Sequence, residues 1–66
     1  MTITLNGTET EVAPAMTVAD LLTDRALPTE GVAVAVNAAV VRAADWAGTP
    51  LAEGDRVEVV LARQGG

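Results

Sequence analysis

The sequence contains no cysteine, histidine, tyrosine or lysine, and Trp46 is its only aromatic residue. Without cysteine and histidine there is neither a disulfide framework nor the usual ligand set of a zinc site. The chain also lacks the imidazole that shuttles protons near neutral pH and most of the side chains that act as nucleophiles. At 66 residues it is too short for two domains. We therefore expect one small domain that is not an enzyme, without catalytic residues, metal ligands or a bound cofactor.

Positive charge is scarce, because four basic residues face nine acidic ones and the net charge is −5 at pH 7. Such a field repels phosphate backbones and favours a partner with a basic face. No apolar run reaches the roughly 18–20 residues of a membrane span, and residues 1–5 alternate in polarity, unlike a leader peptide. We expect neither nucleic acid nor a membrane as a partner, and a cytoplasmic location. Half of the residues are apolar, so the chain should fold.

Carboxylates occur in close pairs, an arrangement that general acid–base catalysis can use. The pairs are Glu9 with Glu11, Asp20 with Asp24, and Glu53 with Asp55. The first pair would share the water-exposed face of a strand. In the second, one aspartate would cap a helix and the other would lie on its exposed side. The third flanks Gly54 in a tight turn, where acidic side chains commonly bond backbone amides. The three patterns indicate structural or solvated carboxylates and no catalytic or metal site.

The first segment predicts a β-hairpin. Residues 1–5 alternate apolar and polar side chains, and Asn6-Gly7 tolerates the positive φ of a two-residue turn. The return strand, residues 8–12, carries glutamates that discourage stray pairing, which is typical of a sheet edge. Pro14 then ends this strand, because proline cannot donate to a sheet ladder.

The next segment predicts a helix over residues 18–26. Thr17 and Asp20 have the spacing of a capping box, with Asp in place of Glu. An apolar stripe at helical spacing follows, and Pro28 closes the helix off. The stripe consists of Val18, Leu21, Leu22 and Ala26. So short a helix is not stable alone, so it must pack on a sheet.

Three further strands and one helical turn are expected. They cover residues 32–36, 40–42, 56–62 and, for the helical turn, 43–47, with a connecting turn at residues 37–39. Trp46 should cover the core instead of stacking on a ligand. The expected fold class is α+β, a mixed sheet of four or five strands with one main helix across one face. If the first and last strands are central neighbours they run parallel, because the helix supplies the crossover.

Small apolar residues would line the sheet face away from the helix. They are Ala33, Ala35, Val60 and Ala62. An exposed apolar patch marks an interaction site, so these residues form a candidate docking patch for partners. The alternative is that some of them belong to the core.

After the last strand the chain finishes with Arg63-Gln64-Gly65-Gly66. We expect a folded domain over residues 1–62 and a flexible tail over residues 63–66. Two glycines remove both Cβ atoms and leave a carboxylate on a thread narrow enough to enter a tunnel. Four extended residues span at most about 13–14 Å, enough to reach the active site of another protein. The reacting group would then be the Gly66 carboxylate, threaded into the partner by the three residues before it.

Six segments, in order along the whole chain, are similar to one family. They are MTITLNG at residues 1–7, TVADLL at 17–22, VAVN at 34–37, Val41-Arg42 with Trp46, Leu51 with EGDRVE at 53–58, and Gly65-Gly66. Together they resemble the ThiS family, the sulfur-carrier proteins of thiamine biosynthesis. The resemblance implies a ubiquitin-like β-grasp fold.

The resemblance also implies the partners and the chemistry. Gly66 would be adenylated by a ThiF-type, E1-like enzyme, which uses ATP and magnesium, and would be converted to a thiocarboxylate. The sulfur would come from a donor such as a cysteine desulfurase. The thiazole synthase ThiG would then receive it, so the chain would act as a co-substrate and bind no cofactor itself.

Three other functions stay open on the sequence alone. The small sulfur-carrier subunit of molybdopterin synthase uses the same tail on the same fold. A ubiquitin-like protein-binding module could carry an incidental glycine pair. A protein modifier would join its last glycine to lysines of target proteins.

Overall fold

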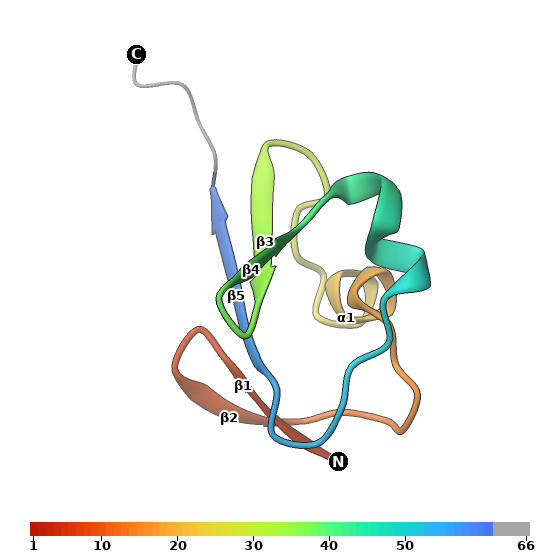
Figure 1. Cartoon of the computed structure of the whole chain (residues 1–66), viewed down its shortest axis with the longest axis vertical. Helices are drawn as coiled ribbons and strands as arrows, with labels where there is room; N and C mark the ends of the chain where they lie inside the picture. The colour runs from red at the N-terminus through yellow and green to blue at the C-terminus, as the bar shows by residue number, and fades with distance from the viewer. Residues whose placement is uncertain (62–66) are drawn as a thin grey trace.

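The computed structural model describes residues 1–61, which form a five-stranded sheet with one α-helix across one face (Figure 1). The elements are β1 (Thr2–Leu5), β2 (Thr8–Glu11), α1 (Val18–Asp24), β3 (Val32–Val36), β4 (Ala39–Val41), the 3-10 helix η1 (Ala43–Gly48) and β5 (Arg56–Leu61). Every expected strand is present at nearly the expected bounds. The expected domain boundary at residue 62 and the tail over residues 63–66 lie outside the described residues.

The sheet has the order β2-β1-β5-β3-β4, so the first and last strands of the chain are neighbours in its middle. The β1–β5 pair is parallel, whereas the other three pairs are antiparallel. A parallel pair needs a long crossover connection, and here that connection contains α1. The expected mixed sheet, with parallel first and last strands and with β2 at an edge, is confirmed.

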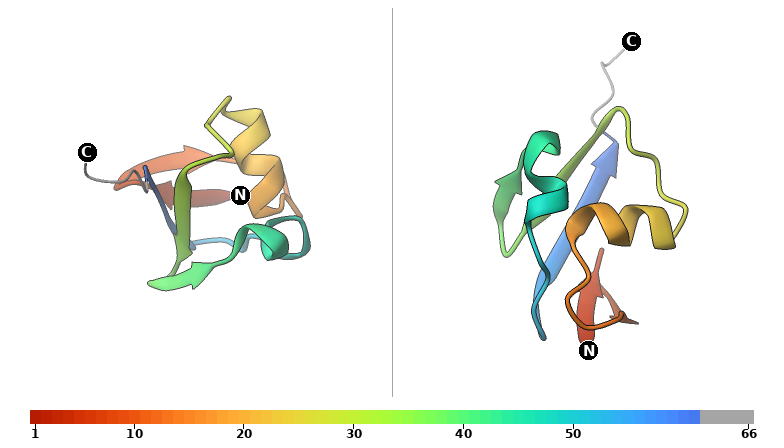
Figure 2. Two further views of the ribbon diagram at one scale, coloured as in Figure 1. Left: turned by 90° about the horizontal axis from the view of Figure 1, so that it is seen from above. Right: turned by 90° about the vertical axis from the view of Figure 1, so that its right-hand side faces the viewer.

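The core lies between α1 and the sheet face that this helix covers (Figure 2). The largest fully buried side chains are Ile3, Val18, Leu21, Leu22, Val34 and Val57. They come from α1 and from one face of β1, β3 and β5. A helix of seven residues is too short to be stable in water, so this apolar contact keeps α1 folded.

Trp46 of η1 belongs to the core, as the sequence predicts. Its side chain is only 8% exposed, and its indole Nε1 donates a hydrogen bond to the Val41 carbonyl oxygen at 2.9 Å. A buried indole N–H needs such an acceptor. The bond therefore fixes η1 against the end of β4.

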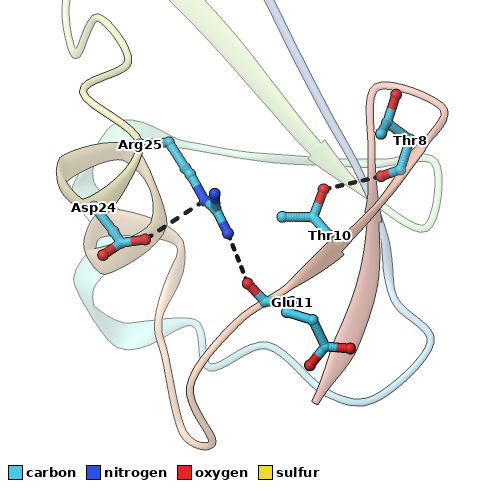
Figure 3. Close-up of polar contacts among 5 residues, drawn as sticks. All are labelled: Thr8, Thr10, Glu11, Asp24 and Arg25. Carbon is cyan, nitrogen blue, oxygen red and sulfur yellow. Dashed lines mark hydrogen bonds and ion pairs between the residues drawn. The ribbon is translucent and has the colours of Figure 1, made fainter.

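Capping and one arginine fix the two ends of α1. The expected capping box is present, because Thr17 Oγ1 accepts from the Asp20 N–H and Asp20 Oδ2 accepts from the Thr17 N–H, both at 3.1 Å. At the other end, Arg25 Nη2 donates to the Glu11 carbonyl oxygen at 2.6 Å, and its Nε lies 3.5 Å from Asp24 Oδ2 (Figure 3). Arg25 therefore ties the end of the helix to the edge strand β2.

The helix ends at Asp24, and the expected end at Ala26 is wrong. Ala26 has a φ of 55°, and the Leu27 N–H donates to the Leu22 carbonyl oxygen at 2.8 Å, which is the pattern of a Schellman motif. This reversal leaves Ala26 exposed and brings Leu27 against the core. Leu27 thus takes the place that the predicted apolar stripe gave to Ala26.

Both hairpins have two-residue turns with positive φ. In the first, Asn6 and Gly7 have φ values of 50° and 84°, as the sequence predicts. In the second, Asn37 and Ala38 have φ values of 52° and 71°. The expected third turn residue, Ala39, instead begins β4. Two-residue turns with positive φ match the twist of the flanking strands, which explains why the shorter turn forms.

We expect Ala26→Gly to stabilise the protein by about 0.5–1 kcal/mol. Left-handed backbone costs alanine about 1–2 kcal/mol, and part of the relief is lost because glycine has more freedom in the unfolded chain. Urea unfolding measures the change. Ala44→Gly is the matched control, since Ala44 is exposed in η1 without positive φ and its replacement should not stabilise. Equal effects of the two substitutions would contradict this interpretation of Ala26.

Candidate functional site

β5 is the strand that leads to residue 62 and to the predicted tail. It lies between β1 and β3 and runs to Leu61, the last described residue. Its end lies across the molecule from the N-terminus (Figure 1). The predicted tail residues Arg63, Gln64, Gly65 and Gly66 lie outside the described residues. The described part of the site therefore consists of β5 and the surfaces beside it.

The start of β5 is held by Asn37. The Asn37 N–H donates to the Arg56 carbonyl oxygen at 2.7 Å, and Asn37 Oδ1 accepts from the Arg56 N–H at 2.9 Å. Asn37 Nδ2 also donates to Asp55 Oδ1 at 3.0 Å. One turn residue of the β3–β4 hairpin thus bonds both the N–H and the carbonyl oxygen of Arg56, the first residue of β5.

The later part of β5 is held in a similar way by Asn6. The Asn6 N–H donates to the Val57 carbonyl oxygen at 2.9 Å. Asn6 Oδ1 accepts from the Val59 N–H at 2.9 Å, and Nδ2 donates to the Val59 carbonyl oxygen at 3.2 Å. The sequence predicts both asparagines only as turn residues. The signal for their bonds to β5 is the carboxamide, because it offers one donor and one acceptor group, as a peptide does.

Three members of the predicted docking patch lie on the sheet face opposite α1, which we call the open face. Ala33 of β3 is the direct partner of Val60 of β5, and Ala35 lies one pleat further along β3. Both alanines are half-buried, Val60 is 57% exposed, and none of the three belongs to the core. Ala62 lies outside the described residues. The use of these residues in docking stays a prediction.

The structure adds Val40 to this surface. Val40 is the direct partner of Ala35 and is 76% exposed, the highest value among the large apolar side chains described. The sequence did not single it out, because a three-residue turn at 37–39 would shift β4 by one residue and reverse which side chains share a face. Ala33, Ala35, Val40 and Val60 are called the open-face patch below.

Charged residues share the open face with the patch. Directly opposed residues of neighbouring strands share a face, which places Glu58 beside Ala35 and both Glu9 and Arg56 beside Thr4 on the open face. Thr4, Arg56 and Glu58 border a hollow of about 300 Å³. The expectation that Glu9 faces water is confirmed, since it is exposed. Glu58 thus lies directly beside the patch, Arg56 lies one pleat further along β5, and Glu9 lies two strands away on β2.

The carboxylates of the 53–55 turn serve the backbone, as predicted. Glu53 Oε1 accepts from the Thr2 N–H at 2.9 Å, and Asp55 Oδ2 accepts from the Ala52 N–H at 2.8 Å. Within residues 1–61, no three acidic side chains come close enough together to hold a metal ion. None of the helices in the same stretch has the length and apolar character of a membrane span.

Comparison with known proteins identifies the family. The model of the ThiS family matches residues 3–66. The chain belongs to the ThiS family. A crystal structure of ThiS, a thiamine biosynthesis protein from Geobacter metallireducens, has 30% sequence identity to the chain, covers 100% of both chains and gives a TM-score of 0.90. A solution NMR structure of a thiamine biosynthesis protein from the same organism has 30% identity, covers 100% of this chain and 88% of the other, and gives a TM-score of 0.79.

These matches confirm two predictions from the sequence. The resemblance to the ThiS family of sulfur carriers is correct, and so is the ubiquitin-like β-grasp fold. A comparison with curated protein sequences found no match.

We expect Val60→Ser to change the free energy of unfolding by less than about 1 kcal/mol, because the Val60 side chain is mostly exposed. Val57→Ser, on the other face of the same strand, should cost about 2–4 kcal/mol, since Val57 is 1% exposed and the change leaves a cavity and a buried hydroxyl. Urea unfolding of the two variants measures both values. A large loss for Val60→Ser would show that the patch is part of the core.

Proposed function

We propose that this chain is a sulfur carrier of thiamine biosynthesis and that the Gly66 carboxylate is the group that carries the sulfur. The family match to residue 66 is the observation that carries this proposal, since it includes the glycine pair. The position of β5 supports it as well. β5 pairs with β1 at its start and with β3 along residues 57–61, so the residues that follow it begin from an ordered strand.

The chemistry requires that the carboxylate be activated by a partner. A carboxylate oxygen attacks the α-phosphorus of ATP, pyrophosphate leaves, and an acyl-adenylate forms at Gly66. A sulfur nucleophile at the oxidation level of sulfide then displaces AMP and leaves a thiocarboxylate. Magnesium and cationic groups of the E1-like partner would stabilise the phosphoryl charge.

The thiocarboxylate needs no basic neighbour on this chain. A thiocarboxylic acid is a stronger acid than a thiol, so its sulfur is anionic and nucleophilic at neutral pH. A folded carrier also delivers the sulfur in a positioned, nearly intramolecular step. The acceptor in this proposal is the thiazole synthase, and Arg63, Gln64 and Gly65 thread Gly66 into it.

The open-face patch is the proposed docking surface for the adenylating enzyme. Val40 and Val60 are 76% and 57% exposed, and the two alanines between them allow close approach. The chain carries a net charge of −5, and Glu58 lies beside the patch. We infer that the partner offers an apolar contact bordered by basic side chains, because opposite potentials favour association.

We expect the protein, incubated with its E1-like enzyme, ATP, magnesium and a sulfur donor, to exchange one oxygen for sulfur. Intact-mass analysis measures the exchange, and fragmentation should place it on Gly66. Deleting Gly66 should abolish the reaction and leave the unfolding curve unchanged, because the core residues all lie within residues 1–61 and the deletion alters none of them. A carrier without Gly66 that still gains sulfur would contradict the proposal.

Docking is tested by Val60→Glu, which we expect to raise the KM for the carrier in the adenylation reaction by about tenfold or more. The substitution removes an exposed apolar contact and adds a charge where the partner is apolar. Ala44→Glu on η1 adds the same charge at an exposed position outside the patch and should leave KM nearly unchanged. Equal KM values for the two variants would contradict docking of the adenylating enzyme on the open-face patch.

A further inference from the structure

The two edges of β5 are supported very differently. On the β3 side, residues 57–61 of β5 pair continuously with Val32–Val36. On the β1 side, the pairing covers only Thr4 with Arg56 and Leu5 with Val57, because β1 ends at Leu5. Among residues 1–61, no strand therefore lies beside the later part of β5 on the β1 side.

The side chain of Asn6 occupies that position. Its Oδ1 accepts from the Val59 N–H at 2.9 Å, and its Nδ2 donates to the Val59 carbonyl oxygen at 3.2 Å. The Asn6 N–H, bonded to the Val57 carbonyl oxygen at 2.9 Å, continues the ladder up to this point. The carboxamide thus gives Val59 an acceptor and a donor, as the backbone of a longer β1 would.

Packing supports this end of β5 only in part. Asn6, Leu27, Val32, Val59 and Leu61 border an open hollow of about 230 Å³. Leu61 itself is 59% exposed. The last residues of the strand are therefore packed on only part of their surface. The position of this end of β5 depends more on the hydrogen bonds to Val59.

We propose that Asn6 is a positioning residue of the sulfur carrier: its carboxamide fixes Val59 and so sets the direction in which the chain leaves the sheet toward Gly66. This inference rests on the proposed function. Val59 stands two residues before Leu61, so a loosened Val59 shifts the end of β5, from which residues 62–66 continue. A misplacement of about 1 Å at a reacting group can cost about a hundredfold in rate.

The chain contains a matched pair of residues for the test. Asn6 and Asn37 both begin two-residue turns, have φ values of 50° and 52°, and bond the β5 backbone through their carboxamides. They differ in place, since Asn37 holds Arg56 at the start of β5 and Asn6 holds Val59 near its end. Glycine keeps the positive φ and removes only the carboxamide, so Asn6→Gly and Asn37→Gly should lower the melting temperature similarly.

The readout is the steady-state adenylation of the carrier by its E1-like enzyme, at a temperature where both variants are folded. We expect Asn6→Gly to lower kcat/KM about tenfold or more and Asn37→Gly to stay within about twofold of the original protein. Asn6→Asp keeps the acceptor for the Val59 N–H and loses the donor, so it should recover part of the loss. Equal kinetics for Asn6→Gly and Asn37→Gly would overturn the inference.

A second readout needs no partner. Amide hydrogen exchange at Val59 should accelerate in Asn6→Gly and stay unchanged in Asn37→Gly, because only the first loses the acceptor of that N–H. Unchanged exchange in Asn6→Gly would also overturn the inference. If the unmodified protein is not adenylated, the proposed function fails, whereas the exchange data still report whether Asn6 holds β5. Should Asn6→Gly not fold, Asn6→Asp takes its place in the adenylation measurement, where it must lower kcat/KM in the same direction by a smaller factor. Exchange at Val59 should stay near that of the original protein in Asn6→Asp, because the acceptor of the N–H remains.

Discussion

The apolar contact between α1 and one face of the sheet is the constraint on which the rest of the structure depends. Leu21 and Leu22 are fully buried against a sheet face that includes Ile3, Val34 and Val57. A seven-residue helix cannot persist without this contact, and the helix is part of the crossover that lets β1 and β5 lie parallel. Because one face of the sheet forms the core, the other face stays uncovered by α1 and carries the open-face patch.

In the function that we propose, the folded elements of residues 1–61 hold the reacting group, Gly66, but take no part in its chemistry. β5 lies in the middle of the sheet and is bonded from the β3–β4 turn at its start and from the β1–β2 turn near its end. These bonds fix the position of β5, the strand from which the following residues continue. The carrier can then supply position while its partners supply catalysis, which is consistent with the small set of reactive side chains in the sequence.

Much of the fold could be predicted from the sequence, because periodicity and capping are local signals. The alternation of Val32–Val36 and the capping box at Thr17 are examples. The left-handed backbone at Ala26 and Ala38 could not be predicted, since tertiary packing overrides the preference of alanine. The face on which Val40 lies depends on whether the turn has two or three residues, because that number sets the register of β4. The bonds of Asn6 to Val59 join residues far apart in the chain, so no local pattern reports them.

The central claim is that this protein carries sulfur for thiamine biosynthesis on its last glycine. Complementation tests it most directly, in a bacterial strain that lacks its own thiamine sulfur carrier but keeps the partner enzymes. The account predicts growth without added thiamine when the full chain is expressed, no growth when the chain lacks Gly66, and no rescue of molybdoenzyme activity in a strain deficient in the small subunit of molybdopterin synthase. Growth that does not depend on Gly66, or rescue of the molybdoenzyme alone, would contradict it.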